Sequence, residues 1–185
     1  MVFKYVSTAL LLLASVPPLN GLFPCVKGIC KKMDIKKFVC TRDLIWTYNT
    51  SSTDYVMCKC DHMKSYRNMT MFFTRSFFVD ERWRRSIQNL EGRFSKHRKE
   101  VMQVSNKDHA VTSIEDLIYM SETYRCAVIL VKQFIPSHQK FYDLRVWDTY
   151  LKARPHEKCI KRFEKLTQRG HGIYMPKCKI ILRIK

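Results

Sequence analysis

Short apolar and alternating segments, separated by polar clusters, dominate the sequence from about residue 35 to residue 146. Because successive side chains of a strand point to opposite faces, such segments predict β-strands. The polar cluster "NTSST" and the Glu91-Gly92 pair, which separates two polar segments, are expected turns. The expected strands, in chain order, are "IKKFVCTRDLIWTY", "DYVMCKCDHM", "MTMFFTRSFFV", "RWRRSIQNL", "RFSKHRKEVMQVS", "AVTSIEDLIYM", "YRCAVILVKQF" and "KFYDLRVW".

One helix is predicted near the C-terminus, in "RPHEKCIKRFEKLTQRG". Pro155 suits the first turn of a helix, and Gly170 ends the pattern. Apolar residues at helical spacing share one face: Cys159, Phe163 and Leu166. A final strand, "IYMPKCKIILRI", is expected to follow. About eight up-and-down strands with one late helix predict an all-β fold, an eight-stranded antiparallel barrel with a C-terminal α-helix packed on its wall, which can hold one small ligand.

The N-terminal segment has the features of a secretory signal peptide. Lys4 supplies a positive charge, residues 5–16 form an apolar run, and residues 17–21 break it with two prolines, an asparagine and a glycine. The run is too short to span a bilayer, and no second long apolar run follows. We therefore predict a signal peptide over 1–21 and one secreted, soluble, monomeric domain over 22–185 without a membrane span. The alternative is a buried N-terminal strand or helix.

Eight cysteines follow the predicted signal peptide. An even number of cysteines in a secreted chain indicates disulfide bonds. The alternative is a zinc site, but Cys58-Lys59-Cys60 lacks the usual two-residue spacing and the six histidines show no paired spacing, so we expect neither a metal nor a cofactor. The eight are Cys25, Cys30, Cys40, Cys58, Cys60, Cys126, Cys159 and Cys178.

Two N-glycosylation sequons begin at Asn49 and Asn68. The net charge is +18, and the predicted signal peptide carries one lysine and no acid, so the mature chain would carry +17. This charge attracts polyanions such as sulfated sugars, nucleic acid or anionic membranes, although it also serves solubility alone. The candidate polyanion-binding residues, in "ERWRRS" and "RFSKHRKE", are Arg82, Arg84, Arg85, Arg93, Lys96, Arg98 and Lys99.

Three groups of segments carry a family resemblance: "DLIWTYNTSSTDYVMCKC", then "YRCAVILV", then "FYDLRVWDTYLKARPHEKCIKRF" with "GIYMPKC". Their order, spacing and cysteines resemble the tick salivary lipocalins, the histamine-binding-protein-like group, over roughly residues 37 to 180. The resemblance implies a lipocalin barrel with a C-terminal helix. It also implies two disulfides, Cys58–Cys178 from an early strand to the chain end and Cys126–Cys159 from the barrel wall to the helix.

Four cysteines remain, and they allow three connectivities. Cys40 and Cys60 lie on the two strands of the first predicted hairpin, so a cross-strand bridge between them is one hypothesis. Cys25 and Cys30 would then close a small N-terminal loop. This region departs from the family, whose members often have a short N-terminal helix there.

Amine-binding members of the group carry a cysteine, an acid and an aliphatic residue, then a Glu-Leu-aromatic triplet, then another cysteine. The matching positions are Cys126-Ala127-Val128, Asp143-Leu144-Arg145 and Cys159. The spacing is kept but the chemistry is not, because alanine replaces the first acid and arginine replaces the aromatic residue. Asp43 matches a further acid that members direct toward an amine, and Trp46 is close to it in the sequence.

In "KFYDLRVW", alternate residues share one face of the expected strand: Phe141, Asp143, Arg145 and Trp147. An inward Arg145 would repel an ammonium group but would grip a carboxylate with two parallel hydrogen bonds. We therefore prefer a lipid acid, such as a leukotriene or a fatty acid, over a biogenic amine such as histamine or serotonin. Its tail would lie in the pocket against Phe141, Trp147, Trp46 and phenylalanines of the third expected strand. Arg75 in "FFTRSFF" is a second candidate cation on an apolar face. The alternative is a half-buried strand with a surface ion pair.

The sequence contains no nucleophile elbow, P-loop, HExxH or dinucleotide glycine pattern, so we do not expect an enzyme. We predict a secreted, glycosylated salivary lipocalin that sequesters a small host mediator and so damps inflammation or haemostasis. The alternative is a basic surface-binding protein without a working pocket, whose partner would be heparan sulfate or another heparin-like polyanion, or a host complement or clotting protein.

Overall fold

The computed structural model describes residues 25–26, 29–30, 33–79, 83–151 and 154–182. The chain divides into two compact units, Met1–Lys31 and Lys32–Lys185. In the first unit the described backbone forms an antiparallel pair, β1 (Cys25–Val26) with β2 (Ile29–Cys30). The predicted signal peptide and the side chains of Cys25 and Cys30 lie outside the described residues, so the predictions about them stay predictions.

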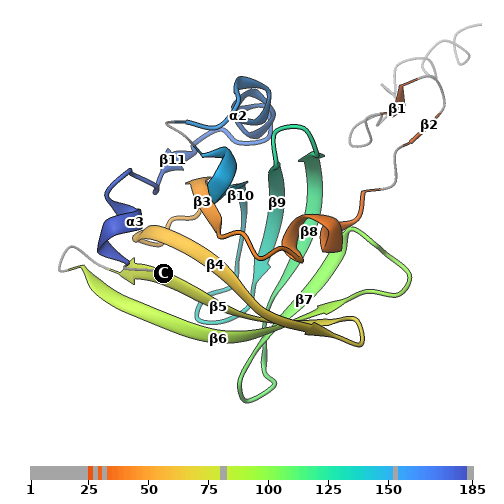
Figure 1. Cartoon of the computed structure of the whole chain (residues 1–185), viewed down its shortest axis with the longest axis vertical. Coiled ribbons are helices and arrows are strands. Elements are labelled where there is room, and N and C mark those ends of the chain that lie inside the picture. The colour runs from red at the N-terminus through yellow and green to blue at the C-terminus, as the bar shows by residue number, and fades with distance from the viewer. Residues whose placement is uncertain (1–24, 27–28, 31–32, 80–82, 152–153, 183–185) are drawn as a thin grey trace, which may run out of the picture. The chain divides into compact units, whose positions relative to one another are not determined.

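In the second unit, eight strands form a closed antiparallel barrel (Figure 1). Each strand pairs with the next along the chain, and the last pairs with the first, which closes the barrel. The predicted fold class is therefore confirmed. The strands are β3 (Ile45–Thr50), β4 (Val56–Arg67), β5 (Thr70–Val79), β6 (Arg84–Phe94), β7 (Val101–Asn106), β8 (Val111–Ser121), β9 (Cys126–Gln133) and β10 (Gln139–Trp147).

The hairpin between β4 and β5 has a two-residue turn. Asn68 and Met69 form it with φ values of 50° and 65°, and Arg67 pairs directly with Thr70 across it. Positive φ at both central positions is typical of a type I′ turn, whose twist matches that of the flanking strands. Asparagine tolerates this conformation better than most residues, so the local sequence favours the hairpin.

Glycine 92 lies inside β6, so the turn predicted at Glu91-Gly92 is wrong. The chain reverses instead between the end of β6 and the start of β7, over residues 95–100. A Cβ atom at Gly92 would lie 2.6 Å from the sulfur of Met102 and 3.5 Å from the ring of Phe73. This glycine therefore allows close packing of the barrel wall and does not mark a turn.

The segment predicted as the first strand divides into a helix and a strand. Asp34 caps the helix α1 (Ile35–Val39), because its carboxylate accepts a hydrogen bond from the backbone N–H of Lys36 at 3.1 Å. The buried residues of α1 have helical spacing and join the interior apolar cluster: Ile35, Phe38 and Val39. Helix α1 covers one end of the barrel, which we call the closed end. Strands β3, β5, β7 and β9 terminate at the opposite end, which we call the open end.

The C-terminal segments cover the outside of the wall (Figure 1). After the short helix η1 (Asp148–Tyr150), helix α2 (Glu157–Glu164) is the predicted helix in shorter form. The predicted final strand is wrong, because only β11 (His171–Gly172) is extended and the segment after it forms α3 (Cys178–Ile181). Pro176 has no N–H with which to continue a strand ladder. No helix among the described residues is long and apolar enough to cross a membrane.

Apolar residues form two clusters, one on each face of the barrel wall. The interior cluster includes Phe73, Leu117 and Ile129, and the outer cluster lies under the C-terminal segments. The outer cluster contains two disulfides, whose Cα atoms are 5.2 Å and 6.4 Å apart. They are the two predicted bridges, Cys58–Cys178 and Cys126–Cys159, and both are confirmed.

The predicted bridge between Cys40 and Cys60 is wrong, because both cysteines are free thiols. Cys40 caps the C-terminus of α1, so it does not lie on a strand, and it packs against the interior cluster. Cys60 lies in the outer cluster. The two thiols therefore face opposite sides of the wall. Burial raises the pKa of the Cys40 thiol to about 11, which makes it a poor nucleophile at neutral pH.

Candidate functional site

The barrel interior holds a cavity of about 380 Å³ at the open end. Apolar and polar residues both line it, and Phe77, Leu90 and Phe141 are among the larger apolar side chains. The charged lining residues are two cations, Lys59 and Arg75, and one acid, Asp54. The volume is within the range of small-molecule sites, which typically combine an apolar wall with a few polar groups.

Six charged side chains form a layer beneath this cavity, which we call the interior charge network. They come from four strands: Lys59 and Asp61 on β4, Arg75 on β5, Glu115 on β8, and Asp143 and Arg145 on β10. Three are cations and three are acids, so the network is neutral. Because moving one isolated charge from water into a protein interior costs several kcal/mol, this one-to-one matching allows all six to be buried.

Arg145 lies at the centre of the network, and its side chain is 1% exposed. Its Nη1 and Nη2 atoms donate to the two carboxylate oxygens of Glu115 at 2.7 Å and 2.9 Å. Nη2 and Nε also donate to Oδ2 of Asp143 at 3.0 Å and 3.3 Å. Every nitrogen of this guanidinium therefore has a carboxylate acceptor.

Arg75 makes a second fork-like contact. Its Nε and Nη2 atoms donate to the two carboxylate oxygens of Asp61 at 2.7 Å and 2.8 Å. Arg75 and Asp61 are directly opposite each other on β5 and β4, so strand register sets this contact. Nη2 also donates to Glu115 at 3.0 Å. Glu115 thus bridges the two arginines and holds the halves of the network together.

Two acids of the network, Glu115 and Asp143, stay ionised despite their burial. Burial alone would raise the pKa of Glu115, but the guanidinium groups of Arg145 and Arg75 hold it well below its usual range. Burial also opposes ionisation of Asp143, and Lys59 and Arg145 keep the pKa of its carboxyl below the usual value. For Lys59 the balance is reversed, because the loss of water lowers the pKa of its ammonium more than Asp143 raises it.

Two groups of the network have unused hydrogen-bonding capacity. Lys59 Nζ donates to Oδ2 of Asp143 at 2.9 Å, its single hydrogen bond within the described part of the chain, although an ammonium has three N–H donors. The other oxygen of Asp143, Oδ1, is buried and has no hydrogen-bond partner among the described residues. Lys59 Nζ also lies 5.6 Å from the ring centroid of Phe141. The cavity therefore presents unmatched donors beside an aromatic ring.

Three of the residues predicted for the pocket come together in this network: Asp143, Arg145 and Arg75. Phe141 also faces the interior and lines the cavity. Arg145 faces inward, as the hypothesis of an inward strand face required, but its acid partners occupy it and it is not part of the cavity lining. The anion anchor expected at Arg145 is therefore better placed on Lys59 and Arg75.

Asp43 and Trp46 lie away from the cavity. Asp43 is outside the barrel end, where its carboxylate accepts hydrogen bonds from the backbone N–H and the hydroxyl of Thr149. Trp46 pairs with Val146 on the outer face of the wall, in the outer cluster. Its Nε1 donates to Asp148 at 2.6 Å. Trp46 is not part of the cavity lining, so the expectation that it lines the pocket is wrong.

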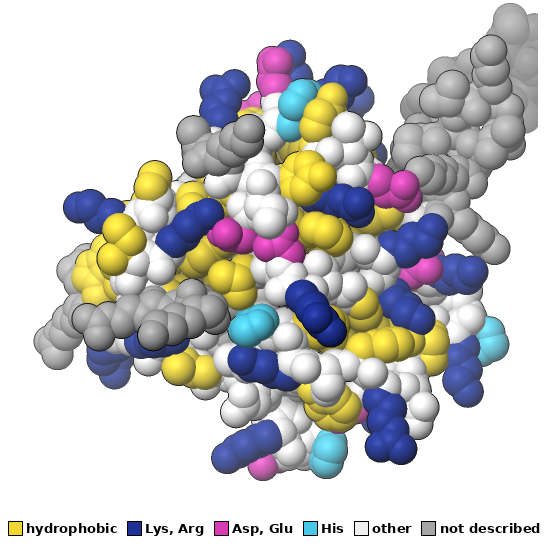
Figure 2. All heavy atoms as spheres, in the orientation of Figure 1, with side chains coloured by type: hydrophobic (Ala, Val, Ile, Leu, Met, Phe, Trp, Pro, Cys, Tyr) yellow, Lys and Arg dark blue, Asp and Glu magenta, His cyan; other side chains and the backbone are white. Residues whose placement is uncertain are grey.

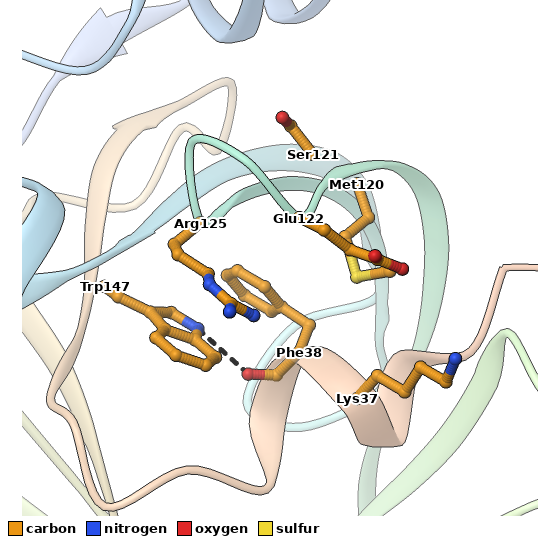
Figure 3. A pocket seen from close by; sticks show the side chains of 7 residues that line it. All are labelled: Lys37, Phe38, Met120, Ser121, Glu122, Arg125 and Trp147. Atoms are coloured by element: carbon orange, nitrogen blue, oxygen red, sulfur yellow. Dashed lines mark hydrogen bonds between the residues drawn. The ribbon is translucent and has the colours of Figure 1, made fainter.

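Trp147 has the inward parity of its strand but lies at the closed end. Its Nε1 donates to the backbone oxygen of Phe38 at 3.0 Å, and the guanidinium of Arg125 lies 4.7 Å from its ring centroid. Figure 3 shows these side chains at a second hollow of about 290 Å³, which Lys37 and Met120 also line. Trp147 is therefore not part of the open-end cavity for which it was predicted.

Sequence reasoning missed Lys59, Asp61 and Glu115. A signal exists for Lys59, because Cys58 and Cys60 both face the outer cluster and the residue between them must face inward. Asp61 and Lys59 are two positions apart and share that face. Glu115 gives a weaker signal, since the adjacent Asp116 is also an acid and only the strand parity distinguishes them.

The network does not have the features of a catalytic site. Each of its acids is ion-paired with at least one cation, and these cations hold Glu115 and Asp143 ionised. In the described part of the chain, no group of three or more His, Cys, Asp and Glu side chains is placed to hold a metal ion. The arrangement supports binding and leaves the absence of catalysis a prediction.

Neither a comparison with protein-family models nor one with curated proteins found a match. Among solved structures, the tick salivary lipocalin Japanin from Rhipicephalus appendiculatus, bound to cholesterol, is similar, with a TM-score of 0.55 and 10% sequence identity. The similarity covers 72% of this chain and 92% of Japanin. At this identity the likeness establishes the fold: the chain folds as a lipocalin barrel of the kind seen in tick salivary lipocalins.

Proposed function

We propose that the protein sequesters a small amphipathic molecule in the open-end cavity, and that a lipid acid such as a fatty acid or a leukotriene is the preferred ligand. The observation that carries the proposal is the position of Lys59. Its ammonium lines the cavity beside the ring of Phe141 and donates one hydrogen bond of a possible three. A carboxylate could accept the remaining donors while its tail lies against Phe77, Leu90 and Phe141.

The arrangement of the acids supports an anionic head group. Asp61, Glu115 and Asp143 are engaged beneath the cavity and are not part of its lining, whereas Lys59 and Arg75 are. A ligand therefore meets the positive side of a neutral network. A charge-assisted hydrogen bond contributes roughly 1.5–3 kcal/mol to the binding free energy. This contribution is large enough for the head group to decide which class of ligand binds more tightly.

The same arrangement disfavours the alternative, a biogenic amine. At the network an ammonium ligand would meet Lys59 and Arg75, which already pair with the acids there. The one acid in the cavity lining, Asp54, accepts hydrogen bonds from the side-chain amides of Gln139 and Gln133 and is the carboxylate that an amine would have to use. A neutral sterol is intermediate, because its hydroxyl can accept from Lys59 without a charge. The expected order of affinity is lipid acid, then sterol, then histamine or serotonin.

The biological consequence follows from the resemblance to tick salivary lipocalins. The two disulfides are typical of proteins that fold in an oxidising compartment, which supports secretion. A secreted protein that removes a lipid mediator would damp inflammation or haemostasis in a host. Sequestration, and not catalysis, is the proposed mode of action.

Titration of the disulfide-intact protein with arachidonate, leukotriene B4, cholesterol, histamine and serotonin tests the proposal. The informative variant is Lys59→Met, because Arg145 still neutralises Asp143 when the ammonium is removed. We expect the affinity for arachidonate to fall about 10-fold to 100-fold, the equivalent of one charge-assisted hydrogen bond. The affinity for cholesterol should change by less than about threefold.

Lys140→Met is the matched control, because Lys140 is an exposed lysine on β10 outside the cavity lining. It should leave every affinity unchanged. Saturable binding of histamine with no binding of lipid acids would contradict the proposal. Equal loss of arachidonate affinity in both lysine variants would show that net charge, and not the cavity cation, is responsible.

A further inference from the structure

The fold divides the seven basic residues of the predicted polyanion site between the two barrel ends. β6 begins with Arg84 and Arg85 at the open end and carries Arg93 near the closed end. At about 3.3 Å per residue, the two ends of this run are roughly 30 Å apart. Arg82 lies outside the described residues, and the remaining members follow in the closed-end loop: Lys96, Arg98 and Lys99. The described members of the seven therefore do not form one compact patch, and their role in polyanion binding stays a prediction.

Other segments bring cations to the closed end instead. The start of α1 is joined to the β6–β7 loop, because the N–H of Ile35 donates to the backbone oxygen of Lys99 at 3.0 Å. The β4–β5 turn is joined to the end of β6, because the N–H of Phe94 donates to the oxygen of Met69 at 3.0 Å. Lys36 Nζ lies 4.6 Å from the ring centroid of Tyr66, which links α1 to the hairpin.

These links create one continuous surface, which we call the closed-end basic surface. In Figure 2, several Lys and Arg side chains lie at the right of the molecule, around the end that carries the β6–β7 loop and the β4–β5 turn in Figure 1, with a few Asp and Glu side chains among them. Other Lys and Arg side chains are spread over the rest of this face. Its members are Lys36 and Lys37 on α1, Lys64 and Arg67 on β4, Arg93 on β6, and Lys96, Arg98 and Lys99 in the loop.

Most of this charge is unmatched. Arg93 pairs with Glu91 at 3.1 Å, and Arg98 pairs with Glu100 at 2.9 Å and with Asp116 at 3.4 Å. The other six cations make no ion pair with any residue that the structure describes. An exposed cation without an acidic partner can neutralise a charge of a polyanion and release a counterion condensed on that polyanion, which favours binding.

We propose that the closed-end basic surface binds a sulfated polysaccharide. The two disulfides indicate an oxidising, extracellular setting, where sulfated polysaccharides are the abundant polyanions and nucleic acid is not. A membrane is a poorer partner, because insertion needs an exposed apolar face and α1 buries its apolar residues in the barrel. A linear sulfated polysaccharide can bind through contacts between its sulfate groups and dispersed lysines and arginines.

This surface is separate from the ligand cavity. The cavity opens where β3, β5, β7 and β9 end, whereas the basic surface belongs to the opposite end of the barrel. Both can therefore be occupied at once. Polysaccharide binding would retain the protein in tissue while the cavity remains accessible. The polysaccharide proposal does not depend on the proposed lipid ligand.

Heparin-affinity chromatography with a salt gradient tests the inference on the full disulfide-intact protein. The closed-end variant is Arg67→Ser/Lys96→Ser/Lys99→Ser. The matched control is Lys107→Ser/Lys140→Ser/Lys165→Ser, which removes the same charge from exposed positions elsewhere. We expect the closed-end variant to elute at clearly lower salt, and its slope of log K against log salt to fall by roughly 2–3, whereas the control should elute close to the wild type.

Competition identifies the partner class. Heparin should displace a fluorescent heparin fragment at far lower concentration than duplex DNA or anionic phosphatidylserine vesicles of equal charge. Equal shifts of the two triple variants would overturn the inference, because net charge alone would then explain retention. Equal competition by DNA or by vesicles would overturn the assignment to a sulfated polysaccharide. Lipid binding should be the same in the presence and absence of heparin.

Discussion

The interior charge network and the closed-end basic surface handle positive charge in opposite ways. In the network, three cations face three acids, and the side chains of Arg145, Glu115 and Asp143 are at most 1% exposed. On the closed-end surface, six of eight cations have no acidic partner among the described residues. The same residue types therefore behave differently in the two places, and burial is what distinguishes them.

The difference follows from solvation. An unpaired charge inside the barrel would lose its water without compensation, so matching is strict there. An exposed lysine keeps its water, so an ion pair would add only about 0–1 kcal/mol and its absence costs little. Each charge beneath the cavity therefore depends on its partners, whereas charge at the closed end is available for a partner molecule.

The largest expected effect comes from Glu115→Gln. The substitution leaves two buried guanidinium groups short of an acid, and breaking a buried ion pair by removing one partner costs about 3–5 kcal/mol. In urea unfolding of the disulfide-intact protein, this loss of stability should appear as a lower urea concentration at the midpoint. Glu164→Gln on the exposed face of α2 is the control and should change stability by less than about 0.5 kcal/mol. A small effect at Glu115 would mean that water enters the network.

The second effect is on the pH dependence of stability. The folded state lowers the pKa of Glu115 and of Asp143, so their contribution is fully present above the unfolded pKa values of about 4. It is lost as the pH falls from there toward the folded values. Urea midpoints at pH 7, 5, 4 and 3 should therefore hold steady to about pH 5 and then fall. Glu115→Gln should flatten that fall, and an identical slope in both proteins would contradict the network's role.

The third effect tests the other side of the comparison. The free energy of unfolding of the closed-end variant Arg67→Ser/Lys96→Ser/Lys99→Ser should lie within about 0.5 kcal/mol of the wild-type value. These exposed cations have no ion pairs to lose among the described residues. Reduced repulsion between like charges could even stabilise it slightly. Thermal unfolding by circular dichroism measures this directly. A loss above about 2 kcal/mol would show that the closed-end charges are structural.

The smallest effect on stability concerns glycosylation. Asn68 is exposed at the tip of the β4–β5 hairpin, whereas Asn49 is half-buried in β3, between β10 and β11. Protein secreted from eukaryotic cells should therefore carry one glycan, at Asn68, and Asn68→Gly should remove it with little change in stability. Intact mass measures both. Because Asn68 follows Arg67 directly, deglycosylated protein should bind heparin more tightly, and a glycan found at Asn49 would contradict this account.

The sequence predicts the barrel well because its information is local. Strand alternation and a helical stripe around Cys159 and Phe163 predict the strands and the late helix. The two observed disulfides are implied by the family resemblance and not by these local patterns. The errors occur where tertiary contacts override local pattern. Gly92 looks like a turn residue, but it lies within a strand, and the sulfur of Met102 occupies the space that a side chain at position 92 would need. The segment after Asp34 reads as a strand, but its three apolar residues fit a helix that closes the barrel.

The site was predictable only in part. Strand parity correctly places Asp143, Arg145 and Arg75 on inner faces. Parity cannot show how Arg145 is satisfied, because its main partner, Glu115, is 30 positions away on another strand. The sequence therefore makes Arg145 the natural anchor, whereas the three-dimensional arrangement leaves Lys59 with the free donors. The error lies in partner choice, which depends on contacts between distant segments.

The most direct test of the central claim is a crystal structure of the protein with bound arachidonate. The account predicts that the carboxylate lies within hydrogen-bonding distance of Lys59 Nζ, on the polar side of the cavity, and that the acyl chain runs past Phe141 and Leu90 toward the open end. The interior charge network should remain intact beneath it. A carboxylate at the mouth of the barrel, with the acyl chain against the network, would contradict the claim.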